Sequence, residues 1–370
     1  MVPDFLLFRR CCNVAIAWGC LFFFNSSAAT EPDPFATVDR VAASAHGRMG
    51  LARENIAPCL FAQVPAPLGL LEAIDRALCL HPQTRLAWAT AKGRADLLGL
   101  AQSAYLPTLN ATVSSNRVRN RNQYQDMAVL DSDVSTRSSN AGLNLNWVLF
   151  DSGLRQANVE MARQTLAAAN AAHDASLQNV LFETAQLYYS VQARQASLNA
   201  SLAAEKAAHD SQIVTEARYL AGAGSLADKL QAETALAQSI LTRGRAEGEL
   251  KNVLGALAGQ IGLPVDSSIS LDIPDAGLPG IEFAASLKAL MEEARQQHPG
   301  LLVARAELDA AIAKVNATKA EGRPSISLTG ATTHTDLRGQ LPADSLSRGH
   351  SIGLQLNIPI FEGFGRSYRI

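Results

Sequence analysis

Apolar and polar residues alternate in four short stretches of the chain, a period that is typical of β-strands. The alternation is clearest at 143–149 and 352–358, where Leu, Trp, Val and Ile residues are interleaved with mainly polar ones. A shorter alternating run precedes each of these, at 108–113 and 325–329. We therefore predict two β-hairpins, one in each half of the chain.

Polar residues between the two runs of each pair predict long loops, near 116–138 and near 332–349. The first loop contains a basic run, Asn116–Arg121, that has no aromatic residues between its charges. We interpret this run as a solvated loop, because single-stranded nucleic acid is bound by charges interleaved with aromatic side chains. A net charge of −2 also gives no domain-wide basic excess, so we expect no nucleic-acid partner.

The period changes to that of a helix between the two hairpins. Over 152–259, apolar residues recur at alternating steps of three and four residues, a pattern that is typical of the seam of a coiled coil. In the first helix this seam includes Leu177, Tyr188 and Leu202. Glycines and a serine interrupt the pattern at 219–230, where one helix would end and the next begin. We predict a helical hairpin whose first helix is about 100 Å long at 1.5 Å per residue.

The chain contains an internal repeat. Residues 70–109 align without gaps on 287–326, at an offset of 217 residues, with His81-Pro82 on His298-Pro299. Each copy continues to a similar junction sequence, LNLNWVLFDSGLR in the first and LQLNIPIFEGFGR in the second. The two histidines could be metal ligands from two halves, but we interpret each as part of a structural kink before its proline.

The first 29 residues have the features of an export signal. Arg9-Arg10 precede the apolar run 11–24, and small residues follow up to Ala29. The apolar run is shorter than the ~20 residues of a membrane-spanning helix. We predict a signal peptide over 1–29, with a lipid anchor on Cys20 as the alternative.

Two cysteines remain after removal of the signal peptide, Cys59 and Cys79. In an oxidising compartment they can form a disulfide. The alternative is that Cys79 is a small apolar residue on the helix face of Ile74 and Leu78. We expect no metal at this pair.

Three observations indicate that the hairpins lie in a membrane. The chain is predicted to be exported, and the polar residues that alternate with the apolar ones are uncharged. The second strand of each hairpin also reaches the ~10 residues that a tilted membrane-spanning strand needs. Backbone groups in lipid must be paired, so the sheet has to close, and the smallest usual barrels have ~8 strands. We therefore expect an α+β membrane protein in which each chain contributes four transmembrane strands to a β-barrel shared within an oligomer.

In such a barrel the second strand of each hairpin has one face toward lipid and one toward the pore. The apolar side chains predicted to face lipid are Leu143, Leu145, Trp147, Leu354 and Leu356. The polar side chains predicted to face the pore are Asn144, Asn146, Gln355 and Asn357.

The sequence lacks the motifs of the common enzyme classes. It has no G-x-x-x-x-G-K-[ST] loop, no H-E-x-x-H, no C-x-x-C and no G-x-S-x-G. We expect neither an enzyme nor a cofactor.

Taken together, these motifs resemble the TolC-like outer-membrane efflux and secretion family over 68–370. The resemblance is carried by the HP helices, the W-x-L-F-D-x-G junction, the tip YLAGAGSLADKLQAETALAQ and the second copy through PIFEGFGR. It is strongest to the outer-membrane component of type I secretion systems of the cyclolysin and haemolysin kind. Such a resemblance implies a homotrimer in the Gram-negative outer membrane, with twelve strands in one barrel and a helical tunnel in the periplasm.

The resemblance also implies partners and site residues. A periplasmic adaptor and an inner-membrane transporter, ABC-type or proton-driven, would supply the energy, and a polypeptide or small molecules would pass through. Docking of the adaptor is implied for Gly222, Gly224, Ser225 and Leu226. Asp228 is implied in the periplasmic gate, with helix capping as the alternative.

We expect the following division: the signal peptide 1–29, an N-terminal segment 30–67, repeat one 68–151, the helical hairpin 152–259 (tip near 219–230), a connector 260–283, repeat two 284–366, and the start of a second helical hairpin at 367–370. Because the family has two helical hairpins, we expect a truncated or frameshifted chain that does not form a sealed tunnel alone.

Two other functions stay open at this point. One is a multidrug or metal efflux channel of the same family. The other is an exported coiled-coil adhesin or scaffold whose strands only oligomerise. Extraction from the outer membrane by detergent would favour a channel, and solubility in the periplasm would favour a scaffold.

Overall fold

The structure is a computed structural model that describes residues 33–41, 67–123, 125, 127, 129, 131–272, 287–339 and 343–370. The predicted signal peptide lies outside these residues. The chain divides into two units, and the second, Thr37–Ile370, contains all the elements discussed below. None of the helices in the part that the structure describes is both long enough and apolar enough to cross a membrane.

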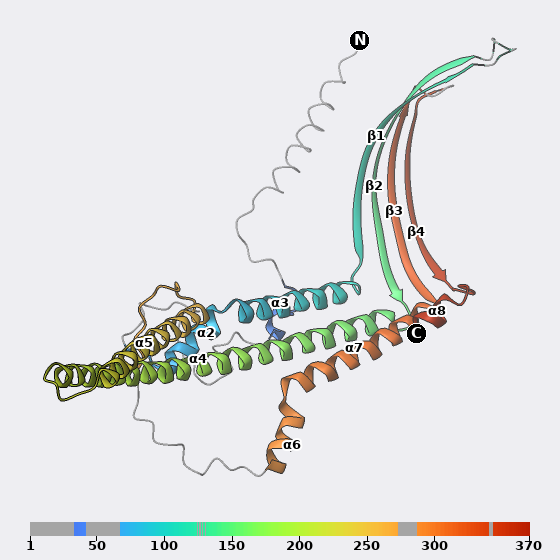
Figure 1. Cartoon of the computed structure of the whole chain (residues 1–370). Coiled ribbons are helices and arrows are strands. Elements are labelled where there is room, and N and C mark those ends of the chain that lie inside the picture. Colours follow the sequence, from blue (N-terminus) through green and yellow to red (C-terminus); the bar gives the residue numbers. More distant parts are fainter. Residues whose placement is uncertain are drawn as a thin grey trace. The chain divides into compact units, whose positions relative to one another are not determined.

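Helices and strands alternate in blocks, which gives an α+β fold as predicted (Figure 1). The helices are η1 (Val38–Arg40), α2 (Leu70–Leu80), α3 (Pro82–Ser103), α4 (Leu154–Leu220), α5 (Leu226–Gln260), α6 (Leu287–Gln297), α7 (Pro299–Glu321) and α8 (Gly365–Arg369). The strands are β1 (Thr108–Asn122), β2 (Ser132–Phe150), β3 (Ser325–Arg338) and β4 (Ser345–Asn357).

The repeat is confirmed by the element boundaries, because α6, α7 and β3 each begin 217 residues after α2, α3 and β1. The two His–Pro pairs also have the same structural function. His81 Nδ1 accepts a hydrogen bond from the Gln83 amide (3.3 Å), and His298 Nδ1 accepts one from the Gly300 amide (3.2 Å). Each histidine therefore caps a helix that begins with proline, in agreement with the structural interpretation.

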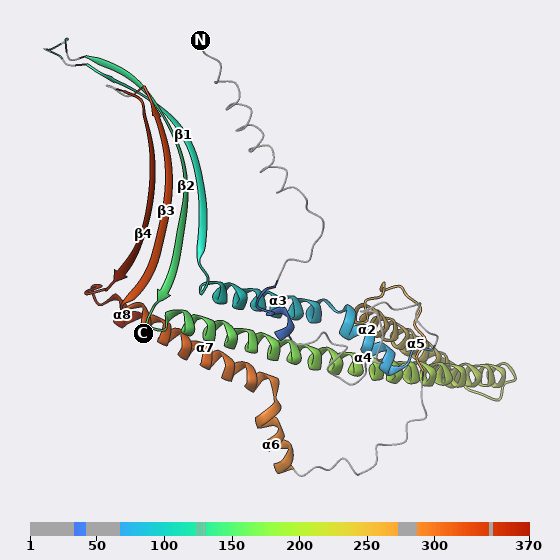
Figure 2. The same cartoon turned by 180° about the vertical axis from the view of Figure 1, so that it is seen from behind.

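Helix α4 is the central element of the helical part. Figures 1 and 2 show α3 and α7 along opposite sides of its first half, and α5 folded back along its second half. With 67 residues, α4 is about 100 Å long at 1.5 Å per residue, as predicted.

The larger apolar core lies where α2, α4 and α5 meet, and a smaller one joins α3 to α4. The predicted seam is buried in this larger core at Leu177 and Tyr188, whereas Leu202, nearer the tip, is 48% exposed. The seam is therefore buried only where α2 covers the α4–α5 pair. A two-helix hairpin has no third element to cover it further out.

Tyr188 joins this core to the two segments that flank it. Its hydroxyl lies 2.7 Å from the carbonyl oxygen of Asp272 and 3.0 Å from that of Leu68. The Leu68 amide also donates to Ser270 O (2.8 Å), and the Asp272 amide donates to Leu68 O (3.0 Å). Burial, and then the negative charge of Asp272, raise the pKa of the Tyr188 phenol, so it stays a donor at neutral pH.

Cys79 is buried on α2 and is disulfide-bonded. Cys59 lies outside the described residues, so its pairing with Cys79 stays a prediction.

The four strands form one antiparallel sheet in the order β1-β2-β3-β4, in which the β2–β3 pairing joins the two repeats. The predicted extent of the loops is wrong: β1 continues to Asn122 and β2 begins at Ser132, while β3 continues to Arg338 and β4 begins at Ser345. Within these extensions most residues on both faces are polar, so they give little alternation signal. The basic run is also wrong as a loop, because it is part of β1.

We predict that Tyr188→Phe lowers the free energy of unfolding by about 0.5–1.5 kcal/mol, because the hydroxyl no longer donates to the carbonyl oxygens of Leu68 and Asp272. Tyr189→Phe is the matched control, since Tyr189 is 55% exposed. Thermal unfolding of the helices, followed by circular dichroism in detergent, measures both. Equal midpoints for the two variants would contradict the prediction.

Candidate functional sites: sheet faces, junctions and helical tip

The strand register brings the apolar residues of all four strands onto one face of the sheet. Residues directly opposite each other in antiparallel strands have side chains on the same face. Leu145 lies opposite Leu109 and Gly330, and Leu328 lies opposite both Trp147 and Leu354. The apolar residues that share this face are Leu109, Val113, Leu143, Leu145, Trp147, Ile326, Leu328, Ile352, Leu354 and Leu356.

Neutral polar residues occupy the opposite face at the same level. Asn144 lies opposite Asn110, Asn146 lies opposite Thr108 and Thr329, and Gln355 lies opposite Ser327. Asn357 pairs with Ser325 on this face as well. The register thus separates the predicted lipid-facing residues from the predicted pore-facing ones, while the medium that each face contacts stays a prediction.

Strands β1 and β4 are the two edges of the sheet that the structure describes. They contain 15 and 13 residues, and each has one edge of backbone groups without a strand partner. Long, regular edges pair readily with strands of another chain.

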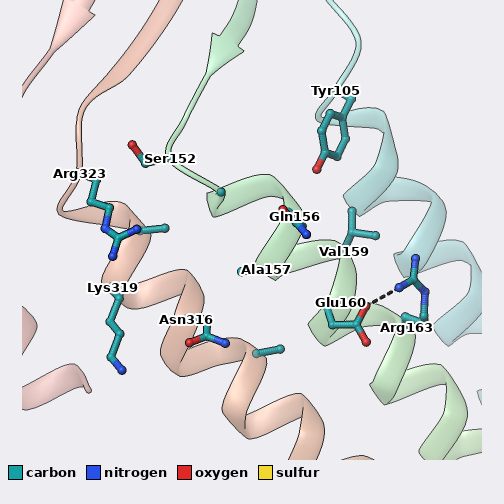
Figure 3. Close-up of a pocket in the computed structure, with 13 residues that line it drawn as sticks. Tyr105, Ser152, Gln156, Ala157, Val159, Glu160, Arg163, Asn316, Lys319 and Arg323 are labelled. Carbon is teal, nitrogen blue, oxygen red and sulfur yellow. Dashed lines mark hydrogen bonds and ion pairs between the residues drawn. The ribbon is translucent and has the colours of Figure 1, made fainter.

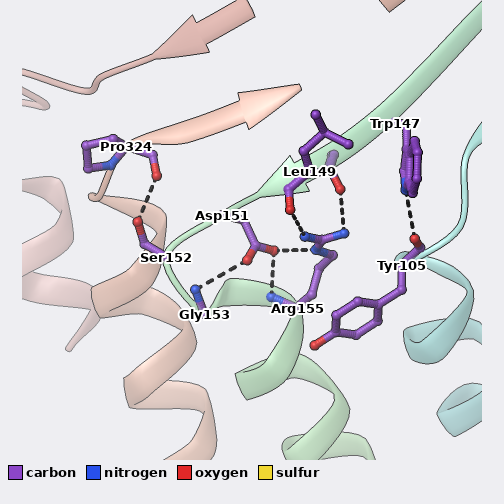
Figure 4. A network of polar contacts seen from close by, with 9 residues as sticks. Tyr105, Trp147, Leu149, Asp151, Ser152, Gly153, Arg155 and Pro324 are labelled. Atoms are coloured by element: carbon purple, nitrogen blue, oxygen red, sulfur yellow. Dashed lines mark hydrogen bonds and ion pairs between the residues drawn. The ribbon is translucent and has the colours of Figure 1, made fainter. Parts of the chain in front are cut away.

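A charged network holds the junction between β2 and α4 (Figure 4). Arg155 Nε donates to Asp151 Oδ2 (2.8 Å), and its two Nη atoms donate to the carbonyl oxygens of Val148 (2.6 Å) and Leu149 (3.3 Å). The Asp151 carboxylate also accepts from the Arg155 amide (2.9 Å), as in a helix N-terminal cap. With side chains only 12% and 11% exposed, Arg155 and Asp151 are well shielded from water.

This network contacts three neighbouring segments. The Arg155 guanidinium lies 4.7 Å from the centre of the Tyr105 ring, a cation–π distance. Trp147 Nε1 donates to Tyr105 O (3.0 Å), and Ser152 Oγ donates to Pro324 O (2.7 Å) (Figure 4). The junction therefore fixes the end of β2 against the end of α3 and against the second repeat.

The second junction has the same backbone conformation. Ser152 and Gly153 have φ values of 54° and 91°, and the equivalent Gly363 and Phe364 have values of 59° and 64°. Two successive left-handed residues thus precede the helix in both copies. Because non-glycine residues rarely adopt this region, the turn is imposed by its surroundings.

The ion pair of the first junction is also repeated. Glu362 and Arg366 replace Asp151 and Arg155, with Arg366 Nε 3.4 Å from Glu362 Oε2. The residue equivalent to Tyr105 is Gly322, and a Cβ atom there would overlap the Arg366 guanidinium. Both arginines therefore lie against the same position of the repeat. The alignment of the two repeats did not predict this contact.

The helical tip is a tight turn in which Gly222, Gly224, Ser225 and Asp228 each have a structural function. Gly222 has a φ of 73° and donates to Tyr219 O (3.0 Å), while the Ala223 amide donates to Arg218 O (2.8 Å). These two bonds form a Schellman motif that ends α4. A Cβ atom on Gly224 would lie 3.2 Å from the Tyr219 amide nitrogen, so glycine permits this close approach.

Asp228 forms a capping box with Ser225 at the start of α5. The Asp228 amide donates to Ser225 Oγ (3.1 Å), and the Asp228 carboxylate accepts from the Ser225 hydroxyl (2.8 Å) and amide (3.3 Å). This geometry supports the capping alternative. A function of Asp228 in a gate stays a prediction.

Ion pairs cross the hairpin between α4 and α5. Lys229 Nζ lies 3.2 Å from Glu216 Oε1 next to the tip, and Arg194 Nη1 lies 2.6 Å from Glu249 Oε2 further back. The hydrogen bond and charge of Lys229 lower the pKa of the Glu216 carboxyl, and the same contact raises the pKa of the Lys229 ammonium. The tip is therefore held by groups that are both charged at neutral pH.

A cavity of about 550 Å³ lies between the end of α3, the start of α4 and the end of α7 (Figure 3). Its lining is mixed in character, and Glu160 is paired with Arg163. Within the described residues there is no group of three or more His, Cys, Asp or Glu side chains that could hold a metal ion. The lining residues are Tyr105, Ser152, Gly153, Gln156, Ala157, Val159, Glu160, Arg163, Ala313, Asn316, Lys319, Ala320 and Arg323.

Comparison with known families gives a match to outer membrane efflux protein over residues 73–263 and 290–370. The chain belongs to this family. The family confirms the predicted resemblance and the outer-membrane location, and it is a family of efflux proteins rather than of enzymes.

Two curated relatives show the extent of the match. Protein CyaE of Bordetella pertussis is 32% identical over 303 residues, which cover 82% of this chain and 62% of the relative. Outer membrane protein TolC of Vibrio cholerae is 26% identical over 307 residues, which cover 80% of this chain and 65% of the relative. The chain thus spans less than two thirds of the length of these relatives.

Solved structures confirm the fold. The CmeC outer membrane channel of Campylobacter jejuni matches with a TM-score of 0.65 at 20% identity, over 81% of this chain and 63% of that one. The outer membrane protein VceC of Vibrio cholerae matches with a TM-score of 0.64 at 21% identity, over 81% and 70%.

We predict that Arg155→Lys lowers the free energy of unfolding by about 1.5–3 kcal/mol, because an ammonium group cannot reproduce the guanidinium hydrogen bonds. Arg163→Lys is the control, since Arg163 is 51% exposed in its pair with Glu160. Thermal unfolding in detergent measures the difference. A larger loss in the control would contradict the prediction.

We predict that the tip loosens at acid pH. The folded pKa of Glu216 lies below its unfolded value of about 4.3, so its contribution is present above that value and lost as the pH falls through the folded pKa. Because the pKa of Lys229 is raised in the folded tip, the ammonium group contributes to the stability of the tip up to at least about pH 10.4. Spin labels at Ser211 and Ala235 should give a distance distribution that broadens below about pH 4.

Glu216→Gln is expected to show the broad distribution already at pH 7, with no further acid transition. Glu247→Gln is the matched control, because Glu247 pairs with Arg243 and Lys251 on its own helix. An acid transition of Glu216→Gln with the midpoint of the unchanged protein would disprove the assignment.

Proposed function

We propose that the chain forms part of an outer-membrane channel, a passive conduit from the periplasm to the exterior. The observation that supports this proposal is the sheet, which has an apolar face, a neutral polar face and two open edges. A curved sheet with these faces can form the wall between lipid and a water-filled pore. The edges require partner strands if the sheet lies in lipid.

The partner strands would come from further copies of the chain. Four strands are fewer than the ~8 of the smallest usual barrels, so one copy cannot close. Three copies supply twelve strands, and β1 of one copy would pair with β4 of the next. We therefore propose a homotrimer, with Leu143, Leu145, Trp147, Leu354 and Leu356 toward lipid and Asn144, Asn146, Gln355 and Asn357 toward the pore.

The helices would continue this wall into the periplasm. In this proposal the β-hairpins of 68–151 and 284–366 form the membrane part, and the helices of these two repeats form part of a tunnel together with 152–259. The turn Gly222, Gly224, Ser225 and Leu226 would dock a periplasmic adaptor, since Leu226 is 52% exposed beside the equally exposed Leu230. Asp228 would contribute its charge to the periplasmic gate while it caps α5.

The energy for transport would come from an inner-membrane transporter bound through the adaptor. We propose an ABC-type transporter and a protein toxin as the exported substrate, on the likeness of the junction and tip sequences to type I secretion components. Efflux of drugs or metals by a proton-driven transporter is the alternative within the same family.

Spin labels on the adjacent residues Asn144 and Leu145 test the proposal. In liposomes, a label at Leu145→Cys is expected to be relaxed by oxygen, which dissolves in lipid. A label at Asn144→Cys is expected to be relaxed by a water-soluble nickel chelate. The two sites are neighbours on β2, so depth and local mobility are matched and only the face differs.

The disulfide at Cys79 keeps that thiol from reacting with the label under non-reducing conditions. Relaxation of both labels by the nickel chelate would contradict a lipid-facing surface. Such a result, together with extraction from the periplasm without detergent, would favour the coiled-coil scaffold.

A further inference from the structure

Every charged residue of the four strands lies on the same face as the apolar side chains. Alternation along each strand and the register between strands fix this placement. The opposite face has no charged residue in any of the four described strands. The charged residues are Arg117, Arg119, Arg121, Asp133, Arg137, Asp336, Arg338 and Arg348.

Three of these arginines form a row across three strands. Arg137 of β2 lies directly opposite Arg117 of β1 and directly opposite Arg338 of β3. The pairing continues without a bulge from this row to Leu143, six residues along β2, which corresponds to about 20 Å at 3.4 Å per residue. The arginine row therefore lies beyond the apolar side chains, near the hairpin loops.

The positive charge of the row is only partly compensated within the chain. Asp133 is paired with Arg119 (2.6 Å) and Asp336 with Arg338 (3.0 Å). Arg117 donates to the Ser135 hydroxyl (3.3 Å), and within the described residues neither it nor Arg137 has a carboxylate partner. Like charges directly opposite each other destabilise a sheet, so an anion from elsewhere would stabilise this arrangement.

The composition of the row indicates what kind of anion fits. All the cationic side chains are arginines, and none of the four strands contains lysine. Arginine binds phosphate through two parallel hydrogen bonds. The neighbouring apolar side chains on the same face would contact acyl chains, so the ligand that fits both features is a phosphorylated lipid.

We propose that the arginine row Arg117–Arg137–Arg338 binds the phosphate groups of lipopolysaccharide in the outer leaflet. The proposal rests on the proposed function, in which this face meets lipid and the hairpin loops lie outside the cell. The row then reaches the headgroup level, where the lipid A phosphates compensate its charge and allow the arginines to lie side by side. The pore face stays neutral.

The test is retention of lipid A by the full chain with Arg117→Gln and Arg137→Gln combined. Bisphosphorylated lipid A added to the protein in detergent micelles is the probe, and the lipid A that remains with the protein after size exclusion has removed the free micelles is the measurement. Retention is expected to fall about tenfold or more, since charge-assisted hydrogen bonds are lost. Arg245→Gln, on the exposed surface of α5, is the matched control and should retain the lipid fully.

Lysine at both positions keeps the charge but not the paired geometry, and is expected to restore retention in part. Unchanged retention by the glutamine variant, or equal retention of dephosphorylated lipid A, would overturn the proposal. Displacement of lipid A by millimolar inorganic phosphate would indicate a free-anion site and would overturn it too. A spin label at Leu145 in the same variant shows, by its relaxation by oxygen, whether the sheet is still in lipid. If the label is relaxed but lipid A retention is unchanged, the lipid A proposal fails while the proposed function stands.

Discussion

Backbone hydrogen bonding at the two edges of the sheet is the constraint on which this architecture depends. Within one chain, β2 and β3 are paired on both sides, but β1 and β4 each have one open edge. In water such edges would be hydrated, whereas in lipid each unpaired N–H or C=O costs several kcal/mol. A sheet with an apolar face that suits lipid can enter it only with its edges paired, so oligomerisation follows from the same register that creates the two faces.

The junctions solve a second problem, because each strand must continue into a helix without losing its position. Two left-handed residues turn the chain at Ser152–Gly153 and again at Gly363–Phe364. An acid–arginine pair then fixes the first turn of the following helix in both copies. In the first copy this pair is largely shielded from water, and its guanidinium also satisfies two carbonyl groups at the end of β2. The two copies thus share the backbone turn and the ion pair. The residue that the arginine contacts differs: it is Tyr105 in the first copy and Gly322 in the second.

Patterns that depend on local period or on self-similarity could be predicted from the sequence. The repeat offset, the length of α4 and the glycine turn at Gly222 all agree with the structure. The ends of the strands could not be predicted, because Arg117 and Arg119 stand in a segment that is polar on both faces and their strand pairing is set by β2. The contact of Arg155 with Tyr105 joins residues 50 positions apart through the packing of α3 on α4, which no local pattern reports.

The distribution of charge over the sheet connects these features to transport. A pore wall that carried fixed arginines would hold acidic segments of a passing polypeptide and would repel basic ones. In this sheet the polar face has no charged residue in the described strands. Its side chains are mainly neutral hydroxyl and amide groups, which exchange hydrogen bonds with water and with either kind of segment, and Val118, Val134, Val148 and Leu337 lie among them. In the proposed channel, the placement of all charges of the described strands on the other face would keep the conduit indifferent to the charge of its cargo. The cost of that placement is a positive surface beside lipid, and phosphorylated lipid in the outer leaflet is the partner that would neutralise it.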